Sequence, residues 1–195
     1  MTDIDFYYDF RSPFAYFATC RMDILESKGA KINWRPVFVD VLLNCQTGKA
    51  PWDETEDPFC PPKRAHFMAD IFRLIEFWQI PFAMPSPPIP SGNTAMAMAA
   101  LLEKDGTSHS QFHDAMFKAI WQEQKDGADP EVVKGALAAG KHDAALLDRE
   151  EEGAELLTKN TLTAYENGVF GTPTFVVSGG LYFGADRMEL IASKL

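Results

Sequence analysis

The sequence predicts an α/β fold in which two small strand-containing units enclose a block of helices. The first unit is a strand, a helix and a second strand over residues 4–10, 13–28 and 31–39. The last unit is a hairpin over residues 172–184, followed by a helix over residues 186–195. Helical periodicity dominates the middle of the chain, where the expected helices are 62–78, 93–105, 108–125, 130–139 and 143–166.

The first unit has clear boundaries in the sequence. Residues 4–10 are rich in Ile, Phe and Tyr and alternate loosely in hydropathy, which is typical of a strand. Ser12 is a favoured N-cap and Pro13 a favoured first helical residue, so a helix is expected to begin there. Gly29 follows the last apolar residue at helical spacing and predicts the end of this helix. A strand, helix and strand so close together form a βαβ unit with a right-handed crossover.

A Pro-rich segment separates this unit from the helical block. Residues 42–62 read LLNCQTGKAPWDETEDPFCPP and are expected to form a long loop. Long loops in compact proteins are often functional.

The last unit returns to strands, and its turn is predicted at Gly179 and Gly180. A helical block placed between the two halves of a small α/β unit indicates a thioredoxin-like topology. We therefore expect a thioredoxin-like domain formed by residues 1–40 and 168–195. Residues 41–167 are expected to form an inserted loop and an all-helical domain.

The overall charge restricts the possible partners. The chain has 195 residues with 28 acidic and 18 basic side chains, a formal net charge of −10. No basic stretch could follow a phosphate backbone, so no nucleic acid is expected as a partner. No apolar run reaches the length of about 18 residues needed to span a bilayer, and no membrane association is expected. The acidic N-terminal segment does not read as a secretory signal.

The cysteines indicate a reducing, cytoplasmic setting. Cys20, Cys45 and Cys60 form neither a CxxC pair nor a disulfide framework. Thioredoxin-like oxidoreductases carry a CxxC where the first strand meets the first helix, and here that place holds residues 12–15, SPFA. Disulfide exchange requires a sulfur nucleophile. A disulfide oxidase is therefore nearly excluded.

Ser12 is the first candidate site residue. Its hydroxyl is expected at a helix N-terminus, where partial positive charge favours anions. The hydroxyl and the helix terminus together could stabilise a thiolate that a ligand brings, as a helix terminus does for a catalytic cysteine. The alternative is that Ser12 only caps the helix.

Two C-terminal motifs supply further candidates. In thioredoxin-like folds a cis-proline opens the strand that faces the active site, and the preceding residue offers its backbone to an extended ligand. Pro173 and Thr172 stand in these positions, although only about 5–6% of X–Pro bonds are cis. Asp186 and Arg187 near the start of the last helix could hold an α-amino-acid group, or Asp186 could simply cap that helix.

These motifs together resemble the 2-hydroxychromene-2-carboxylate isomerases and the related kappa-class glutathione transferases. The resemblance covers nearly the whole chain and rests on four segments. They are FYYDFRSPFAYF (6–17), PPKRAHFMADIFRLIEFWQIPF (61–82), GVFGTPTFVV (168–177) and FGADRMELIASKL (183–195). The resemblance implies a thioredoxin-like fold with an inserted helical domain, as in DsbA-type proteins, and glutathione as cofactor.

The resemblance also implies roles for individual residues. Ser12 would hydrogen-bond the glutathione sulfur and favour its thiolate. Thr172, beside Pro173, would pair through its backbone with the cysteinyl part. Ala185, Asp186 and Arg187 would hold the γ-glutamyl end, although kappa enzymes often carry Ser where Ala185 stands.

Three positions in the middle of the chain bear on the same resemblance. Lys49 stands where the family usually has Asn, and it could attract a carboxylate of glutathione or of the substrate. Lys63 matches the family and could face the glycine end of glutathione or an acidic substrate. His66 stands where Tyr is more common, which indicates a shifted substrate preference.

The implied activity is a glutathione-dependent cis–trans isomerisation in aromatic catabolism, with a small aromatic carboxylate as substrate and a homodimer as the assembly. A thiolate adds reversibly to the conjugated substrate and allows rotation about the resulting single bond. One alternative is a kappa-like transferase or peroxidase, and a second is a non-catalytic glutathione-binding scaffold. The expected substrate pocket has an aromatic wall and a cation, drawn from Phe14, Tyr16, Phe38, Trp52 and Phe59 and from Lys49, Lys63 and Arg64.

His109 and His113 lie four residues apart and could be read as metal ligands. No adjacent Glu and no third ligand accompanies them in the sequence. We therefore expect a surface helix there and no metal site.

Overall fold

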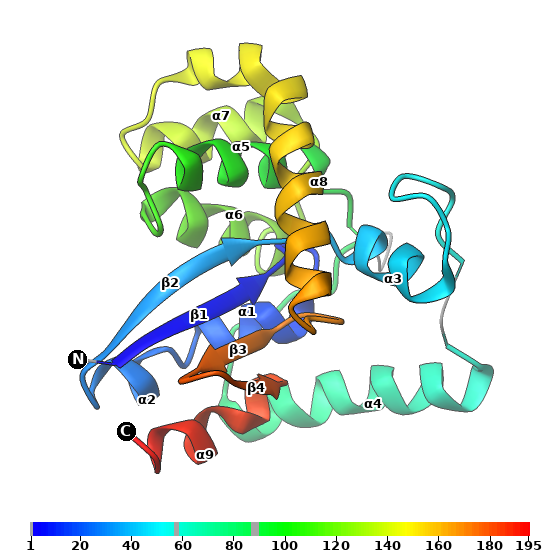
Figure 1. Ribbon diagram of the computed structural model, residues 1–195, viewed down its shortest axis with the longest axis vertical. Helices are drawn as coiled ribbons and strands as arrows, with labels where there is room; N and C mark the ends of the chain where they lie inside the picture. The colour runs from blue at the N-terminus through cyan, green and yellow to red at the C-terminus, as the bar shows by residue number, and fades with distance from the viewer. Residues whose placement is uncertain (1, 57–58, 87–89) are drawn as a thin grey trace.

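The computed structural model describes residues 2–56, 59–86 and 90–195, and Figure 1 shows its ribbon. Its four-stranded sheet has the order β2-β1-β3-β4. The strands are β1 (Thr2–Tyr8), β2 (Ala30–Pro36), β3 (Thr174–Val177) and β4 (Gly180–Phe183). β1 is parallel to β2 and antiparallel to β3, and β3 is antiparallel to β4. The two predicted strand-containing units therefore form one mixed sheet.

The helices follow the predicted order around this sheet. They are α1 (Pro13–Thr19), α2 (Asp23–Glu26), α3 (Val39–Thr47), α4 (Pro61–Trp78), α5 (Asn93–Lys104), α6 (Gln111–Trp121), α7 (Pro130–Ala139), η1 (Ala144–Arg149), α8 (Glu150–Glu166), η2 (Ala185–Arg187) and α9 (Met188–Ala192). Figure 1 shows α5 to α8 as a block above the sheet, with α4 as a separate long helix below it. The predicted division into 1–40 with 168–195 and 41–167 stays a prediction.

Alternation along β1 builds the core. Ile4, Phe6 and Tyr8 are fully buried on one face, as a period of two requires. The Phe6 ring stacks on Phe175 of β3 at 5.1 Å and meets the edge of Trp34 of β2 at 5.0 Å. The core continues without a break into apolar residues of α5 and α6. The sheet and the helical block therefore share one core.

The predicted helix over residues 13–28 is divided into α1 (Pro13–Thr19) and α2 (Asp23–Glu26). Between them, the amides of Arg21 and Met22 donate to carbonyls three residues earlier, at 3.1 and 3.4 Å. This is the tighter winding of a 3₁₀ turn. Because that winding keeps the apolar residues on one side, the sequence period does not reveal the break.

α3 differs from the prediction, which ends a strand at residue 39 and begins the long loop at residue 42. It has no side-chain cap of its own, and the Val39 amide donates instead to Asp9 Oδ2 at 3.0 Å. Gly48 ends the helix with a left-handed φ of 72°. A contact that spans 30 residues leaves no mark in the local sequence.

Two other predicted helices begin with a 3₁₀ turn. The pattern over 143–166 is η1 followed by α8, and the pattern over 186–195 is the end of η2 followed by α9. In the ranges that the structure describes, no helix combines the length and the apolar character that a membrane crossing needs.

Candidate functional site

Ser12 lies at the junction of β1 and α1 and caps α1 as predicted. Its Oγ accepts a hydrogen bond from the Ala15 amide at 3.2 Å. Its hydroxyl donates to the carbonyl oxygen of Thr172 at 3.3 Å. Ser12 and Thr172 are only 9% and 8% exposed. Two residues that are 160 positions apart in the chain thus meet in one sheltered place.

The peptide bond between Thr172 and Pro173 is cis, as the motif suggested. The Pro173 carbonyl accepts a hydrogen bond from the Gly184 amide at 3.0 Å. The Thr172 hydroxyl is buried and has no hydrogen-bond partner among the described residues. Buried polar groups are nearly always hydrogen-bonded, so this hydroxyl needs an explanation.

The third predicted segment follows Gly184 directly. Gly184 has a φ of 110°, a conformation that favours glycine, and η2 begins at the next residue. Ala185 is buried, and its carbonyl accepts from Arg21 Nη1 at 3.3 Å. The exposed side chains of Asp186 and Arg187 form an ion pair of 3.4 Å. The bond from Gly184 to Pro173 links this segment to the first two.

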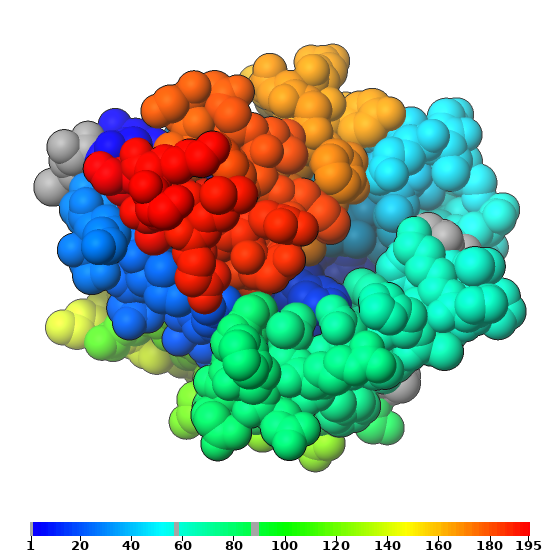
Figure 2. All heavy atoms as spheres, turned by 90° about the horizontal axis from the view of Figure 1, so that it is seen from below, coloured from blue at the N-terminus to red at the C-terminus, as the bar shows by residue number. Residues whose placement is uncertain are grey.

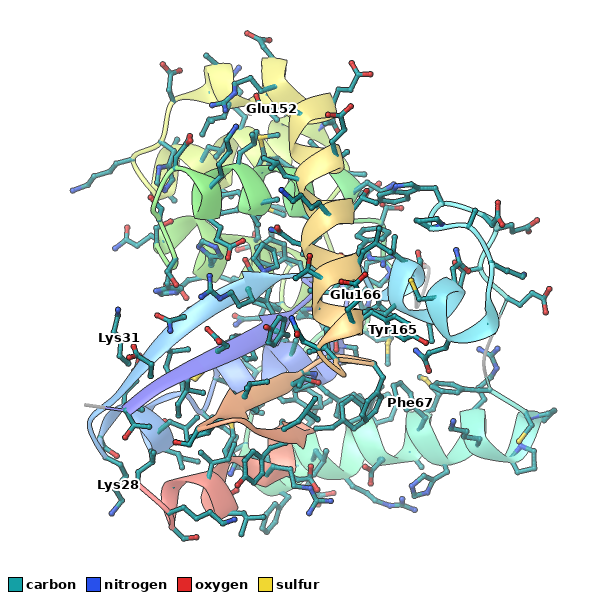
Figure 3. All side chains as sticks on the ribbon, viewed as in Figure 1. Lys28, Lys31, Phe67, Glu152, Tyr165 and Glu166 are labelled. Atoms are coloured by element: carbon teal, nitrogen blue, oxygen red, sulfur yellow. The ribbon has the colours of Figure 1, made fainter. Side chains whose placement is uncertain are left out.

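A row of aromatic rings links Lys63 to Phe14 in the first turn of α1. Lys63 Nζ lies 4.8 Å from the Phe59 ring centroid. The Phe59 ring lies 4.8 Å from Phe67, and Phe67 lies 4.9 Å from Phe14, two residues after Ser12. Figure 3 shows Phe67 rising from α4 toward the sheet. Apolar rings therefore lead from the start of α1 to a cation.

The surface is hollowed between α4 and the C-terminal segment. Figure 2 shows a depression whose floor is dark blue, the colour of the N-terminal residues. The green-teal helix α4 borders it on one side, and the orange-red C-terminal segment borders it on the other. The depression lies on the face that Figure 2 shows.

Lys49 is held in its own loop. Its Nζ donates to the Glu54 carbonyl at 3.2 Å and to Glu56 Oε1 at 2.9 Å. Asn44, which is buried, fixes this loop by donating to the Pro51 carbonyl at 3.0 Å. None of the contacts described for Lys49 reaches Ser12. His66 lies exposed on α4, one residue before Phe67.

The aromatic residues expected to wall a pocket are divided between several places. Phe14 and Phe59 belong to the row described above. Tyr16 is buried, and its hydroxyl donates to the Pro81 carbonyl at 2.5 Å, so this side chain is part of the core. Phe38 pairs with Trp52 at 5.2 Å.

Two residues near Ser12 did not emerge from the sequence. Phe67 lies one helical turn after Lys63, so the spacing of four on a predicted helix could have revealed it. Arg11 is buried next to Ser12 and contacts Asp9 and Asp40. Only its place inside the quoted FYYDFRSPFAYF motif could have drawn attention to it.

A family model described as the DSBA-like thioredoxin domain matches residues 3–195. This chain belongs to the DsbA-like thioredoxin-domain family. The predicted fold class is thereby confirmed.

The relatives of this DsbA-like chain include isomerases and transferases. The 2-hydroxychromene-2-carboxylate isomerase of Sphingobium xenophagum is 29% identical over 196 residues, which cover 98% of this chain and 97% of that protein. Glutathione S-transferase kappa 1 of Caenorhabditis elegans is 28% identical over 211 residues, which cover 98% and 90%. A solved 2-hydroxychromene-2-carboxylate isomerase structure matches with a TM-score of 0.75 at 21% identity and covers 98% of this chain and 93% of that one. The predicted resemblance is confirmed.

The expected surface helix at His109 and His113 is wrong, because His109 precedes α6 and His113 lies on its buried face. His113 is buried and accepts a hydrogen bond from the Ser110 amide through Nδ1 at 3.1 Å, which caps α6. Burial, with a smaller contribution from His109, lowers the pKa of His113 to about 3. The His109 ring stacks on Trp34 at 4.3 Å. Across the described ranges, no group of His, Cys, Asp and Glu side chains could hold a metal ion.

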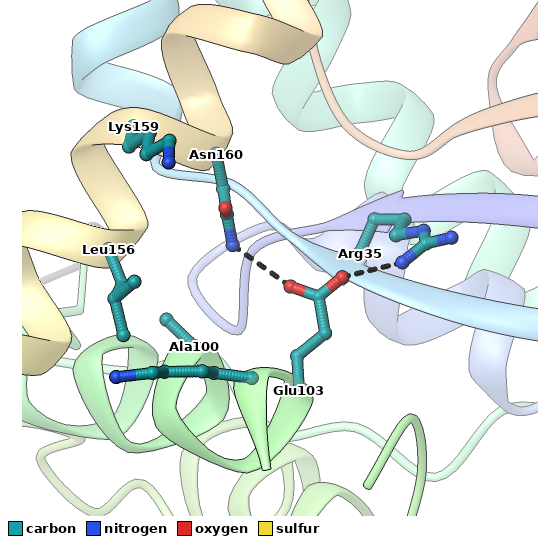
Figure 4. Close-up of a pocket in the computed structure, with 7 residues that line it drawn as sticks. Arg35, Ala100, Glu103, Leu156, Lys159 and Asn160 are labelled. Carbon is teal, nitrogen blue, oxygen red and sulfur yellow. Dashed lines mark hydrogen bonds and ion pairs between the residues drawn. The ribbon is translucent and has the colours of Figure 1, made fainter. Parts of the chain in front are cut away.

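A cavity of about 270 Å³ lies elsewhere, between β2, α5 and α8 (Figure 4). It is lined by Arg35, Ala100, Glu103, Lys104, Leu156, Lys159 and Asn160. Glu103 accepts from Arg35 Nη1 at 2.8 Å and from Asn160 Nδ2 at 2.9 Å. None of the predicted site residues lines this cavity.

Proposed function

We propose that this DsbA-like chain is a glutathione-dependent isomerase of the 2-hydroxychromene-2-carboxylate type. One observation carries the proposal. The three segments that the family resemblance assigns to glutathione are joined by two hydrogen bonds, from Ser12 to Thr172 and from Gly184 to Pro173.

The residues fit such a cofactor. The Thr172 hydroxyl is buried without a partner among the described residues, so a polar ligand at this place would meet an unsatisfied group. Ser12 offers a hydroxyl instead of the CxxC of a disulfide oxidase. Asp186 and Arg187 offer opposite charges, which suit an α-amino and a carboxylate group. Ala185 offers only its backbone, so one hydrogen bond available to a serine is lost.

The chemistry follows from these groups. Bound glutathione would supply a thiolate that adds reversibly to a conjugated double bond and leaves again after rotation. The single Ser12 proton is donated to the Thr172 carbonyl in the structure described here. Turning that proton toward a sulfur anion frees the Thr172 carbonyl to accept a hydrogen bond from the ligand backbone. The Ser12 hydroxyl thus stabilises negative charge on sulfur while Thr172 takes up the ligand.

Because α1 is short, the Ser12 hydroxyl is expected to contribute more than the helix terminus to stabilising a thiolate. The helix after Ser12 spans seven residues, Pro13–Thr19, where a longer one was expected. We therefore assign stabilisation of the thiolate chiefly to the Ser12 hydroxyl.

The substrate proposed is a small aromatic carboxylate. The rings of Phe14, Phe67 and Phe59 form one row that offers apolar contact to a planar ligand. Lys63 stands at the far end of this row and offers a cation to a carboxylate. Aromatic pairs of this kind contribute about 0.5–1.5 kcal/mol beyond their buried area. A planar acid would lie along the row with its carboxylate toward Lys63.

The test begins with a titration of the protein with glutathione near neutral pH, followed by ultraviolet thiolate absorbance. A saturable thiolate signal is expected, and hydroxychromene carboxylates are then assayed by product analysis. An isomerised product without loss of glutathione supports the isomerase. Absence of saturable binding would contradict the proposal.

A kappa-like transferase or peroxidase is the second candidate, and the similarity to the Caenorhabditis elegans protein supports it. Its signature is a stable glutathione adduct, or glutathione disulfide formed with a peroxide. The third candidate is a non-catalytic scaffold, which Lys49 and His66 favour as departures from the family. Binding without a thiolate signal would point to this scaffold.

We also propose a homodimer in the cytoplasm. Phe72 and Phe77 of α4 are 55% and 78% exposed, and exposed apolar patches often mark interfaces. Cys20, Cys45 and Cys60 are free thiols, which suits a reducing compartment. Sedimentation equilibrium of the wild type and of Phe77→Glu tests the dimer, and a wild-type monomer would contradict it.

A further inference from the structure

The residue before Ser12 carries a buried guanidinium. The Arg11 side chain is only 10% exposed and forms ion pairs with Asp9 at 3.0 Å and with Asp40 at 2.9 Å. Arg11 Nε also donates to Asp9 Oδ1 at 3.3 Å, so the guanidinium forms a bidentate ion pair with this carboxylate. Burial opposes the charged form of Arg11, but the two carboxylates outweigh it and raise the pKa above its ordinary value.

Asp9 connects this guanidinium to the backbone around Ser12. It is fully buried, and its carboxylate accepts from the amides of Arg11 at 2.9 Å and of Val39 at 3.0 Å. Its carbonyl accepts from the Ser12 amide at 3.0 Å. A buried carboxylate requires a counter-charge, which Arg11 supplies to Asp9. The position of the backbone turn from Asp9 to Ser12 therefore depends on the position of the Arg11 guanidinium.

The Arg11 side chain is also packed along its length. Its guanidinium carbon lies 3.9 Å from the centroid of the Phe38 ring. Its aliphatic stem runs against Gly92, where an added Cβ would lie 2.8 Å from Arg11 Cγ. Arg11 therefore has one well-defined position, and the absence of a side chain at Gly92 makes room for it.

We propose that Arg11 is a positioning residue that holds the Ser12 hydroxyl where it stabilises a glutathione thiolate. The inference rests on the proposed function. Arg11 acts through the turn, since each of its three nitrogens donates to Asp9 or Asp40. A positioning role depends on the geometry of the guanidinium fork, whereas a purely electrostatic role depends on charge alone.

Two variants separate geometry from charge. Arg11→Lys keeps the positive charge but loses the fork. Gly92→Ala retains every charged group but forces the Arg11 stem to move, and the φ of −166° at this position lies outside the left-handed region. Gly135→Ala is the matched control, because a Cβ there would meet nothing within 4 Å.

Two measurements are made on each variant. The pH dependence of thiolate absorbance gives the pKa of the bound thiol, and calorimetry gives the affinity for S-methylglutathione, which has no ionisable thiol. Arg11→Lys and Gly92→Ala are expected to raise the thiol pKa by about one unit, a tenfold shift of the ionisation equilibrium toward the neutral thiol. Their affinity for S-methylglutathione is expected to stay near the wild-type value. Gly135→Ala is expected to change neither quantity.

The outcomes are distinct. A wild-type thiol pKa in Arg11→Lys and in Gly92→Ala overturns the inference and leaves the proposed function intact. Parallel loss of S-methylglutathione binding also overturns it, because the whole site would then be disturbed. If Arg11→Lys does not fold, Gly92→Ala decides alone. A wild-type protein that binds no glutathione refutes the proposed function itself.

Discussion

The Ser12 hydroxyl donates its proton to the Thr172 carbonyl at 3.3 Å, and the same oxygen accepts from the Ala15 amide at 3.2 Å. One side chain therefore joins the first helix to the segment before the cis-proline. A ligand that accepts a hydrogen bond from the Ser12 hydroxyl must therefore replace the Thr172 carbonyl as its acceptor. Binding at this place and local structure are consequently coupled.

Ser12→Ala is expected to abolish most of the thiolate signal while the fold is retained. Loss of the cap is expected to lower the free energy of unfolding by about 1 kcal/mol. Ser110→Ala is the matched control, because Ser110 caps α6 by accepting from the Phe112 amide. Thiolate absorbance and urea denaturation are measured on both variants. A similar stability loss in both, with thiolate lost only in Ser12→Ala, is the expected result. Full thiolate formation in Ser12→Ala would show that Ser12 is only a cap.

Thr172→Val is expected to raise the free energy of unfolding by on the order of 1 kcal/mol, because it removes a buried hydroxyl without a partner among the described residues. Thr174→Val provides the contrast, since the Thr174 hydroxyl donates to the Gly171 carbonyl at 2.7 Å. That variant is expected to lose about 1 kcal/mol. Urea denaturation measures both values, and equal losses in the two variants would contradict the assignment of Thr172.

Phe67→Leu is expected to weaken the use of aromatic substrates. It keeps an apolar side chain but removes the ring that joins Phe14 to Phe59. Aromatic contacts of about 0.5–1.5 kcal/mol correspond to a rise in KM of roughly two- to tenfold. Phe72→Leu is the control, because Phe72 lies on the same helix and is 55% exposed. An unchanged KM in Phe67→Leu would show that the Phe67 ring does not contact the substrate.

Stability is expected to fall as the pH drops from about 6.5. The pKa of His113 is lowered to about 3 in the folded chain, mainly by burial, from an ordinary value of 6.5. Between these values the unfolded chain binds the extra proton, so the stabilising contribution is complete above pH 6.5 and is lost on acidification. Each extra proton gives a slope of about 1.4 kcal/mol per pH unit.

His113→Gln tests this slope. Gln at the third position of a helix keeps an acceptor for the Ser110 amide and does not titrate. Unfolding free energies between pH 6.5 and pH 5 are expected to change less in this variant than in the wild type. Identical slopes would assign the acid sensitivity to other groups.

Much of the fold could be predicted because the residues that favour helix starts and turns locally stand where the tertiary structure has a helix start or a turn. The Ser12–Pro13 pair marks the start of α1. The hairpin turn lies one residue earlier than predicted, at Ser178 and Gly179, because Gly180 already pairs with Val177 as the first residue of β4. α3 could not be predicted, because its start depends on Asp9, which is distant in the chain. Local patterns do not contain such contacts.

For a similar reason, only part of the candidate site could be predicted from the sequence. Ser12, Thr172 and the segment before α9 belong to recognisable motifs, and the structure brings these segments together. Roles in glutathione binding stay predictions. The contacts of Lys49 stay within its own loop, where its charge is paired with Glu56, so its role in ligand binding stays a prediction. Arg11 was missed because its burial depends on a glycine far along the chain.

The central place of β1 has a consequence for synthesis of the chain. β1 pairs with β2 early in the sequence, but its other edge is covered only when β3, beginning at Thr174, becomes available. Until then a nascent or truncated chain presents the unpaired edge of an apolar strand, which can pair with other chains. Fragments that end before Thr174 should therefore aggregate, and the ribosome must release nearly the whole protein before its sheet is protected.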